Sequence, residues 1–300
     1  MAQHYNPRIV TEDLVLCLDA ASQASLTQIG TTWSDLSDNN NNGTLSSSSQ
    51  TVTNRGFTLQ YQINNTTEDA MIISGNSSTD LTNGEILMID SEQVKVGAFT
   101  NYFGSYPRFE ITRGHNSTTA AAHSAGVALK KVADYISFDG NSQITDVGDI
   151  GNVFGTSFTI DLWIYPTEID DRQEFIGQKQ NSNYWWRFGI DELDNWEIDV
   201  QDNGSRTVSL NPDFSLVINQ WQHVVLSRDS SNWNFYLNGA LDVTASDSDT
   251  IPDMAASVKL GRPVDSAYEG RMAVVRIYDR YLSAAEISKN FNAQRGRFGV

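Results

Sequence analysis

Alternating hydrophobic and polar residues predict β-strands along much of the chain. The clearest segment runs from Ser157 to Pro166, with Phe158, Ile160, Leu162 and Ile164 on one face and Thr159, Asp161, Trp163 and Tyr165 on the other. A strict period of two is typical of a strand that buries one face, and the proline marks its end. We therefore expect a half-buried strand over this segment.

Further strands are expected in the C-terminal half, where short apolar runs are separated by turn residues. They cover residues 221–228, 233–237, 240–243, 258–261 and 271–278. Asn238 and Gly239 separate two of these runs and favour a two-residue hairpin, because both residues tolerate positive φ. Many short strands at spacings of roughly 8–12 residues favour an antiparallel β-sandwich or jelly roll.

One short helix is expected near the C-terminus. Ser283 is followed three residues later by Glu286, which is the pattern of a capping box at a helix start. We expect the helix to run to about Asn290 and to pack Ile287 and Phe291 on the sandwich.

The segment between residues 37 and 131 has a different pattern. Residues 37–53 are rich in Asn and Ser and are expected to form a loop. Short strands are expected at 85–90, 93–96 and 108–113, with a tight turn at Ser91-Glu92. The small residues 117–126, which include three consecutive alanines, fit either one helical turn or a loop.

Composition narrows the classes of protein that such a fold could serve. The chain of 300 residues carries 37 acidic and 20 basic residues, which gives a formal charge of −17. This balance argues against a nucleic-acid binder, which needs clustered Lys and Arg, and against binding to anionic membranes. With 39% hydrophobic residues, the chain has enough apolar side chains for a sizeable core.

The single cysteine and the apolar runs bear on location. Cys17 has no partner for an intrachain disulfide, and its apolar neighbours predict a small buried core residue. No run approaches 18 consecutive apolar residues, so no transmembrane helix is expected. Because the first residues lack the basic and apolar regions of a signal peptide, we expect synthesis and folding in the cytoplasm.

Five signatures occur in a fixed order between Tyr135 and Phe291. They are Tyr135-Ile136-Ser137-Phe138-Asp139-Gly140, Phe158-Thr159-Ile160-Asp161-Leu162-Trp163-Ile164, Trp221-Gln222-His223-Val224-Val225, Phe235-Tyr236-Leu237-Asn238-Gly239 and Gly270-Arg271-Met272 through Leu282-Ser283. Their order and spacing resemble the laminin-G-like, concanavalin-A-like jelly-roll family. Residues 14–45 look like the first strands of the same domain. The resemblance implies an all-β, antiparallel jelly-roll sandwich.

In that family these first strands lie close in sequence to the rest of the domain, whereas residues 47–131 separate them here. Insertions are tolerated where the ends of a loop are close in space. We therefore expect an N-terminal arm (1–11), a discontinuous jelly roll (12–46 plus 132–300) and an inserted small β-module (47–131). Residues 86–92 and the string R-G-x-x-x-T-x-A-A-x-H, from Arg113 to His123, resemble a small β-module of tailed-bacteriophage virion proteins.

The strongest enzyme signal is the segment from Glu197 to Asp202, E-I-D-V-Q-D. It resembles the Glu-x-Asp-x-x-Glu strand of family 16 glucanases, and alternation would place Glu197 and Asp199 on one face. The third acid departs from that pattern, because Asp202 is shorter than Glu. The segment also precedes Asn203-Gly204, a hairpin tip, and a solvated hairpin is the interpretation we favour. We therefore expect no enzyme activity.

Histidine spacing gives no metal motif, and His123 is expected to serve packing or turn bonding. A calcium site is implied by the jelly-roll resemblance, with Asp35, Asn39 and Asn41 of the first long loop as oxygen ligands. The alternative is that this loop caps itself through Asx-turns. No cofactor is required by any motif.

A sugar site would need exposed aromatic rings with polar neighbours. The candidates that we select are Trp163, Tyr165, Trp185 and Trp186. Trp185 and Trp186 are adjacent, so in a strand they point to opposite faces and one of them is expected to be exposed. The alternative for all of these rings is packing in the core of the sandwich.

Taken with the resemblances, these features lead us to expect a structural or accessory protein of a bacteriophage particle, such as a capsid decoration, fibre or tail-associated protein. Its partners would be other virion proteins and further copies of itself, with no nucleic acid or membrane. The alternative is a lectin-like module that binds a surface glycan for attachment, and a glucanase is the third hypothesis.

Overall fold

The structure is a computed structural model that describes residues 9–22, 24–26, 31–47, 54–64, 67–78, 81, 83–90, 92–115, 118–131, 135–168, 171–214 and 216–300. It divides into two compact units, residues 1–50 with 135–300 and residues 51–134, here called the jelly-roll unit and the inserted unit. These boundaries lie within four residues of positions 47 and 131, the boundaries expected from the sequence for the inserted module. Most of the expected N-terminal arm, residues 1–8, lies outside the described residues.

One antiparallel sheet of the jelly-roll unit brings the two ends of the chain together. In the described residues its order is β1 (Leu14–Asp19), β21 (Glu269–Tyr278), β12 (Ser157–Pro166), β17 (Gln222–Asp229), β18 (Asn232–Leu237) and β19 (Ala240–Ser246), and β10 (Ile136–Asp139) also pairs with β21. Cys17 of β1 lies opposite Arg276 of β21. It is buried as expected, and burial raises the pKa of its thiol to about 11.

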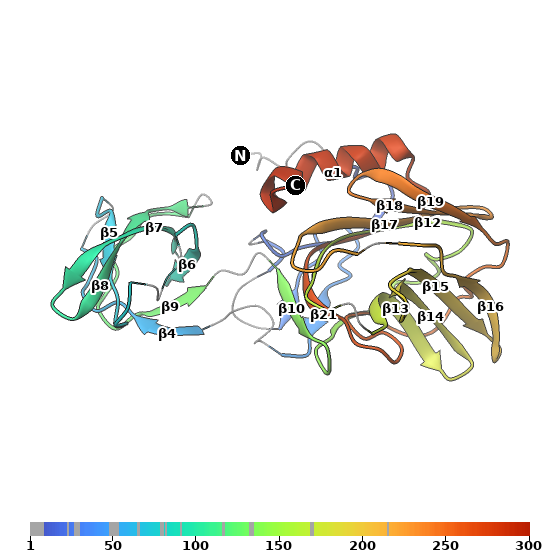
Figure 1. The fold of residues 1–300 in the computed structure, drawn as a ribbon, viewed down its shortest axis with the longest axis horizontal. Helices are drawn as coiled ribbons and strands as arrows, with labels where there is room; N and C mark the ends of the chain where they lie inside the picture. The colour runs from blue at the N-terminus through green and yellow to red at the C-terminus, as the bar shows by residue number, and fades with distance from the viewer. Residues whose placement is uncertain are drawn as a thin grey trace. The chain divides into compact units, whose positions relative to one another are not determined.

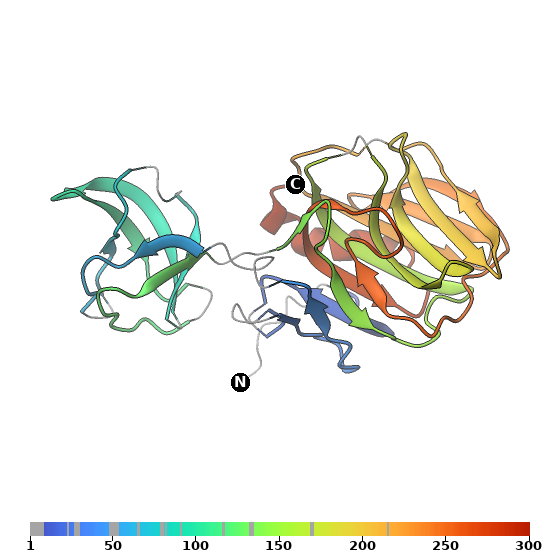
Figure 2. The same cartoon turned by 90° about the horizontal axis from the view of Figure 1, so that it is seen from below.

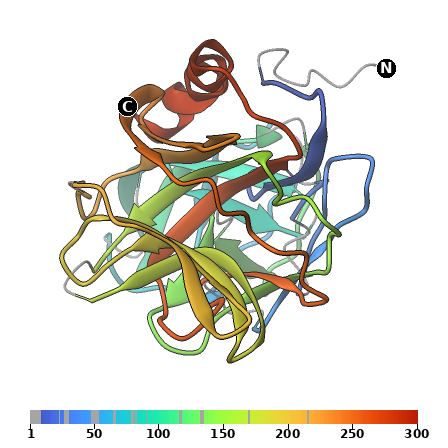
Figure 3. The ribbon, with the colours of Figure 1, turned by 90° about the vertical axis from the view of Figure 1, so that its right-hand side faces the viewer.

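The second antiparallel sheet carries the candidate sites of this unit. Its order, over the part of the chain that the structure describes, is β16 (Ser205–Leu210), β15 (Trp196–Asp202), β14 (Tyr184–Ile190), β13 (Gln173–Asn181), β20 (Val258–Leu260), β11 (Thr145–Gly148), β3 (Gly43–Leu45) and β2 (Thr32–Trp33). The two sheets face each other (Figure 3). Their inner faces share one apolar core, which includes Phe158, Ile160 and Leu162 of β12 and Trp186, Phe188 and Trp196 of the facing sheet. The fold is the expected jelly-roll sandwich.

Helix α1 (Ala284–Phe298) covers the outer face of the first sheet (Figure 1). The predicted capping box is confirmed, since the Ser283 side chain accepts from the backbone N–H of Glu286 and the Glu286 side chain accepts from that of Ser283. The predicted end at Asn290 is wrong. The helix continues to Phe298, whose ring stacks on Trp163 with centroids 4.0 Å apart, and it ends at Gly299 with φ of 73°.

This helix also corrects the expectation of a half-buried strand at residues 157–166. On the polar face of β12, Thr159, Asp161 and Trp163 are buried like the apolar face, and Asp161 is fully buried. Asp161 accepts hydrogen bonds from Arg276 Nη1 (3.0 Å) and from Asn290 Nδ2 of the helix (2.9 Å). Burial alone would raise the pKa of Asp161, but the nearby His223 and Arg276 hold it well below its usual range.

The hairpin between β18 and β19 confirms the predicted turn. Asn238 and Gly239 have φ of 49° and 78°, so both occupy the left-handed region that a two-residue turn of this kind requires. A Cβ on Gly239 would also lie 2.7 Å from the Phe291 ring. Because glycine has no side chain, the helix can pack against the hairpin at this position.

The inserted unit is a separate, curved antiparallel sheet (Figure 2). Its order, within residues 54–131 as described, is β4 (Asn54–Thr58), β9 (Ala128–Lys131), β6 (Ile86–Ile89), β7 (Glu92–Phe103), β8 (Tyr106–Thr112) and β5 (Ala70–Ile72). Its core gathers inward-facing residues of several strands, among them Leu87, Ile89, Val94, Val96, Phe109 and Leu129. Residues 118–122 form a loop, which decides between the two alternatives for the alanine run. Among the described residues no helix is both long and apolar enough to cross a membrane.

Candidate functional site

The outer face of the second sheet holds a buried group of charges, which we call the Arg187 cluster: Arg187 with Glu174, Glu197 and Asp199. Arg187 Nη2 lies 2.8 Å from Asp199 Oδ2, its Nε 3.1 Å from Glu197 Oε2, and its Nη1 3.3 Å from Glu174 Oε1. Arg187 is 5% exposed, and the three carboxylates are at most 1% exposed. One guanidinium thus serves three buried acids.

Strand register explains how these side chains meet. Arg187 of β14 lies opposite Asp199 of β15, and Gly189 lies between Glu174 and Glu197 on its two neighbouring strands. A Cβ on Gly189 would lie 1.9 Å from the carbonyl oxygen of Gln173, so no side chain can stand between the two acids. The alternation that brings Glu197 and Asp199 to one face confirms that part of the prediction.

Two more arginines flank the cluster. Arg172 Nε lies 2.9 Å from Glu197 Oε2, and its Nη1 lies 2.8 Å from Glu192 Oε1. Arg206, whose side chain is 49% exposed, reaches Asp199 Oδ2 at 3.3 Å. The buried acids are therefore linked to the surface through arginine side chains.

The close packing of three carboxylates shifts the pKa values of the groups in the Arg187 cluster. Burial and the neighbouring Asp199 raise the pKa of Glu197 to about 7, against the lowering effect of Arg187 and Arg172. Burial works to lower the pKa of Arg187, but the three carboxylates outweigh it and raise that pKa. Glu197 therefore holds a proton more readily than an ordinary glutamate.

The interpretation of residues 197–202 as a solvated hairpin is wrong for its first half. Glu197 and Asp199 are buried and ion-paired because the outer face of this sheet is covered, whereas Asp202 at the strand end is partly exposed. Val264 and Asp265 of a long loop cover part of this face and donate their backbone N–H groups to Glu174. Neither Glu197 nor Asp199 presents a carboxyl group to solvent in this arrangement.

Beside Arg172 the surface opens into a polar pocket of about 410 Å³. Four acidic side chains contribute to its lining: Glu168, Asp171, Glu192 and Glu269. None of the described residues that line this pocket is aromatic, so they offer no ring face on which a sugar could stack.

The four aromatic residues selected as sugar candidates are not an exposed platform. Trp163 and Trp186 are fully buried, and Trp185 is 8% exposed with Arg187 4.9 Å above its ring. The expectation that one member of the adjacent pair is exposed is therefore wrong, because both faces of β14 are covered. Tyr165 is partly buried and packs against Trp221 at 5.4 Å.

The first long loop caps itself instead of collecting oxygen ligands. Asp35 Oδ1 accepts from the backbone N–H groups of Cys17 and Ser37, and its Oδ2 accepts from that of Asn41. The side-chain amides of Asn39 and Asn41 donate to backbone carbonyls of β1. Within the described residues, no group of three or more His, Cys, Asp or Glu side chains could hold a metal ion. The Asx-turn alternative describes the hydrogen bonding of this loop, and a calcium site at Asp35, Asn39 and Asn41 stays a prediction.

The inserted unit contains a second buried carboxylate, and we call its surroundings the Glu92 cluster. Both Glu92 oxygens are bonded, to Arg113 Nε (2.8 Å) and Nη2 (2.7 Å) and to the backbone N–H groups of Gly114 (2.8 Å) and Ala121 (2.9 Å). His123 Nε2 lies 2.9 Å from the same carboxylate, and its Nδ1 lies 2.9 Å from Asp90. Burial opposes ionisation, but these hydrogen bonds lower the pKa of Glu92 to about 2.

The Glu92 cluster explains the string from Arg113 to His123. Five of its six matched positions have a structural role: Arg113, Gly114, Ala121 and His123 surround Glu92, while Thr118 accepts from the backbone N–H of Gln93. The proposed packing role of His123 agrees with its 4% exposure. The string therefore closes the module around one carboxylate.

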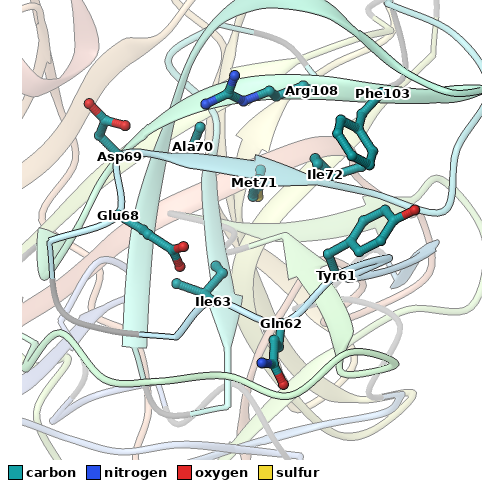
Figure 4. Close-up of a pocket in the computed structure, with 10 residues that line it drawn as sticks. All are labelled: Tyr61, Gln62, Ile63, Glu68, Asp69, Ala70, Met71, Ile72, Phe103 and Arg108. Carbon is teal, nitrogen blue, oxygen red and sulfur yellow. The ribbon is translucent and has the colours of Figure 1, made fainter.

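A pocket of about 410 Å³ in the inserted unit has exposed aromatic rings, which are absent from the described residues of the jelly-roll unit (Figure 4). Tyr61 is 45% exposed and Phe103 is 55% exposed, and their rings meet edge to face at 5.2 Å. Neither residue was predicted from the sequence. The available signal was Tyr102-Phe103-Gly104, where two aromatics precede a turn glycine at a hairpin tip.

Comparison with known families agrees with this fold. Residues 138–288 match the family model of the concanavalin A-like lectin/glucanases superfamily. The chain belongs to this superfamily, and the match starts after the inserted unit. No curated protein matches the chain.

Several solved structures share the fold at low identity. Domain 4 of AbnA, a GH43 extracellular arabinanase from Geobacillus stearothermophilus in complex with arabinotriose, is 18% identical over 52% of this chain and 80% of its own, with a TM-score of 0.40. The Ruminococcus gnavus IT-sialidase CBM40 bound to alpha2,3 sialyllactose is 16% identical over 45% and 83%, with a TM-score of 0.39. The binding domain of botulinum neurotoxin serotype D is 13% identical over 95% and 53%, with a TM-score of 0.47. At these identities the likeness is one of fold and transfers no activity.

Proposed function

We propose that this protein is a non-enzymatic accessory protein of a tailed-bacteriophage particle, in which the jelly-roll unit is displayed and the inserted unit contributes contacts to neighbouring subunits. The observation that carries the proposal is the Glu92 cluster. The resemblance to a virion β-module rests on the string from Arg113 to His123, and the side chains or backbone of that string enclose one buried carboxylate. The structural roles of these residues support the interpretation of the string as the signature of a small fold.

The state of the Arg187 cluster supports the non-enzymatic part of the proposal. A glycosidase needs one carboxyl group that reaches the leaving oxygen and a second that faces the sugar. Here Glu197 and Asp199 are at most 1% exposed and both bond Arg187. Asp202, the third acid of the glucanase-like segment, is partly exposed at the strand end.

The test is mass spectrometry of particles purified from lysates of the producing strain by density-gradient centrifugation. The polypeptide is expected to co-sediment with the major capsid protein in a constant ratio across the particle peak. Imaging of the same particles should then show residues 51–134 against a neighbouring subunit, in one or more copies. Particles that lack the polypeptide would refute the proposal.

A second candidate function, a carbohydrate-binding module, is favoured by one specific observation. Tyr61 and Phe103 present exposed rings beside polar side chains in a pocket of the inserted unit. This function is compatible with a place in a particle, because a displayed protein can also attach to a surface glycan.

A further inference from the structure

The pocket of the inserted unit forms where two neighbouring segments separate. Segment 59–63 runs beside β5, and the backbone N–H of Gln60 donates to the carbonyl of Ile72 at 2.8 Å. Beyond this bond Ile63 pairs instead with His123, at 2.8 Å and 2.9 Å in the two directions. The gap between the two segments is the pocket, and Tyr61 lies on its wall (Figure 4).

The Glu92 cluster holds the pocket walls. His123, which bonds Glu92, fixes the segment that carries Tyr61 through its backbone pair with Ile63. Arg113, which also bonds Glu92, donates from Nη1 to the carbonyl of Glu68 at 3.3 Å on the other wall. The opening is therefore set by buried ion pairs, and a ligand would meet a preformed site.

The two ends of the pocket differ in chemistry. Tyr61 and Phe103 form an aromatic corner at one end, with Ile72 beside it, while Glu68 and Asp69 lie toward the other end (Figure 4). Arg108 extends along the same wall and lies opposite Ile72 in the β5–β8 register. An apolar ring face next to hydrogen-bond acceptors and a guanidinium donor matches a molecule with one apolar face and a rim of hydroxyl groups.

An extended peptide fits this geometry less well. Strand addition needs several successive backbone groups along an open edge. The edge of β5 is closed at Ile72 by Gln60, and Glu68 at the other end accepts the backbone N–H of Asn64 at 2.7 Å. The volume of about 410 Å³ lies in the range of small-molecule pockets, roughly 300–1,000 Å³.

We propose that the inserted unit, and not the jelly-roll unit, carries a binding site for an uncharged oligosaccharide, with a sugar ring on Tyr61 and Phe103 and its hydroxyl groups on Glu68, Asp69 and Arg108. The carboxylates at the rim disfavour acidic sugars through like-charge repulsion. This inference rests on the second candidate function and is independent of a place in a particle.

The experiment begins with the full chain on an array of neutral and acidic glycans. The best neutral oligosaccharide is then titrated by calorimetry, with sialyllactose as the acidic comparison. Tyr61→Ala and Phe103→Ala should each weaken binding by about tenfold, since each removes one stacking surface. Asp69→Asn, an exposed change that leaves the rings in place, should weaken it less.

Tyr102→Ala is the matched control, because Tyr102 lies on the same hairpin, is 47% exposed and does not line the pocket. Tyr102→Ala should bind the oligosaccharide as tightly as the unchanged chain does. Tyr61→Phe, which keeps the ring, should retain most of the affinity that Tyr61→Ala loses. Binding that survives Tyr61→Ala and Phe103→Ala would overturn the location while leaving carbohydrate binding in place. Absence of binding to every neutral glycan, or binding of extended peptides alone, would overturn both.

Discussion

Two buried clusters, one in each unit, each pair glutamate with arginine and shift the pKa of the glutamate in opposite directions. In the inserted unit the single carboxylate of Glu92 receives Arg113, His123 and two backbone N–H groups, and its pKa falls to about 2. In the jelly-roll unit three carboxylates share Arg187, and the pKa of Glu197 rises to about 7. Both carboxylates are almost fully removed from solvent.

The difference shows that burial does not set the sign of the shift by itself. Desolvation raises the pKa of each acid, and the number of donors for each carboxylate then decides which effect wins. Around Glu92 the donors outnumber the buried acids, whereas Glu197 must share Arg187 with Asp199 and Glu174. The Glu92 cluster holds the inserted unit together through an ionised carboxylate. The Arg187 cluster places a carboxyl group that binds a proton near neutral pH inside a sheet.

The largest effect is expected from Arg187→Ala, which leaves three buried acids without their shared partner. Removing one member of a buried ion pair costs roughly 3–5 kcal/mol, and we expect about 4 kcal/mol here. All seven Trp residues lie in the jelly-roll unit, so urea unfolding followed by Trp fluorescence reports this unit alone. Arg206→Ala is the matched control: its exposed contact with Asp199 should cost less than about 1 kcal/mol. Equal losses in the two variants would contradict the assigned role of Arg187.

The next effect is expected from Glu92→Gln, which should destabilise the inserted unit by about 3 kcal/mol because Arg113 loses its buried partner. Because no Trp lies within residues 51–134, hydrogen exchange at β7 and β8 is the suitable measurement. Faster exchange should be confined to this unit. Glu110→Gln changes an exposed acid on the same sheet and should leave exchange as it is. Unchanged protection in Glu92→Gln would show that the cluster does not hold the module.

The smallest effect is a pH dependence of opposite sign in the two units. A raised pKa means that the folded jelly-roll unit binds more protons than the unfolded chain between pH 4.5 and about 7. The contribution of Glu197 to stability is therefore fully present below pH 4.5 and is lost as pH rises through about 7. For Glu92 the contribution is present above pH 4.5 and is lost as pH falls toward 2.

Urea midpoints measured by Trp fluorescence between pH 4.5 and 8 check this for Glu197. Glu197→Gln should flatten the profile across that range, and at pH 8 it should be neutral or stabilising because it removes one of three crowded charges. At pH 8, Glu92→Gln should instead destabilise the inserted unit, because it removes a carboxylate that its donors stabilise. A profile that does not change in Glu197→Gln would show that this residue does not titrate near neutrality.

Much of the fold follows from local sequence signals. The period-two pattern of 157–166, the Asn238-Gly239 turn and the Ser283 capping box each rest on neighbouring residues, and each element is observed. The hairpin β13–β14 was not predicted, because its strands are largely buried on both faces and charged residues such as Glu174 and Arg187 interrupt the apolar pattern.

The candidate site was harder to predict. Selecting Trp163 and Trp186 relied on residue type, but the exposure of a ring depends on what packs over it from distant parts of the chain. The pocket at Tyr61 and Phe103 joins positions 42 residues apart in sequence (103 − 61), and no periodic pattern connects them.

By itself, the sequence determined the class of the fold, the helix start and the string that marks the inserted unit, because alternation, capping and turn preferences act over a few neighbouring residues. Only the tertiary structure decided which charges are buried and which rings are exposed. Helix α1 covers the polar face of β12, and Arg187 gathers acids from three strands. Burial and pairing depend on long-range contacts, and those contacts turned an expected solvated hairpin into a buried cluster and moved the candidate sugar site into the insert.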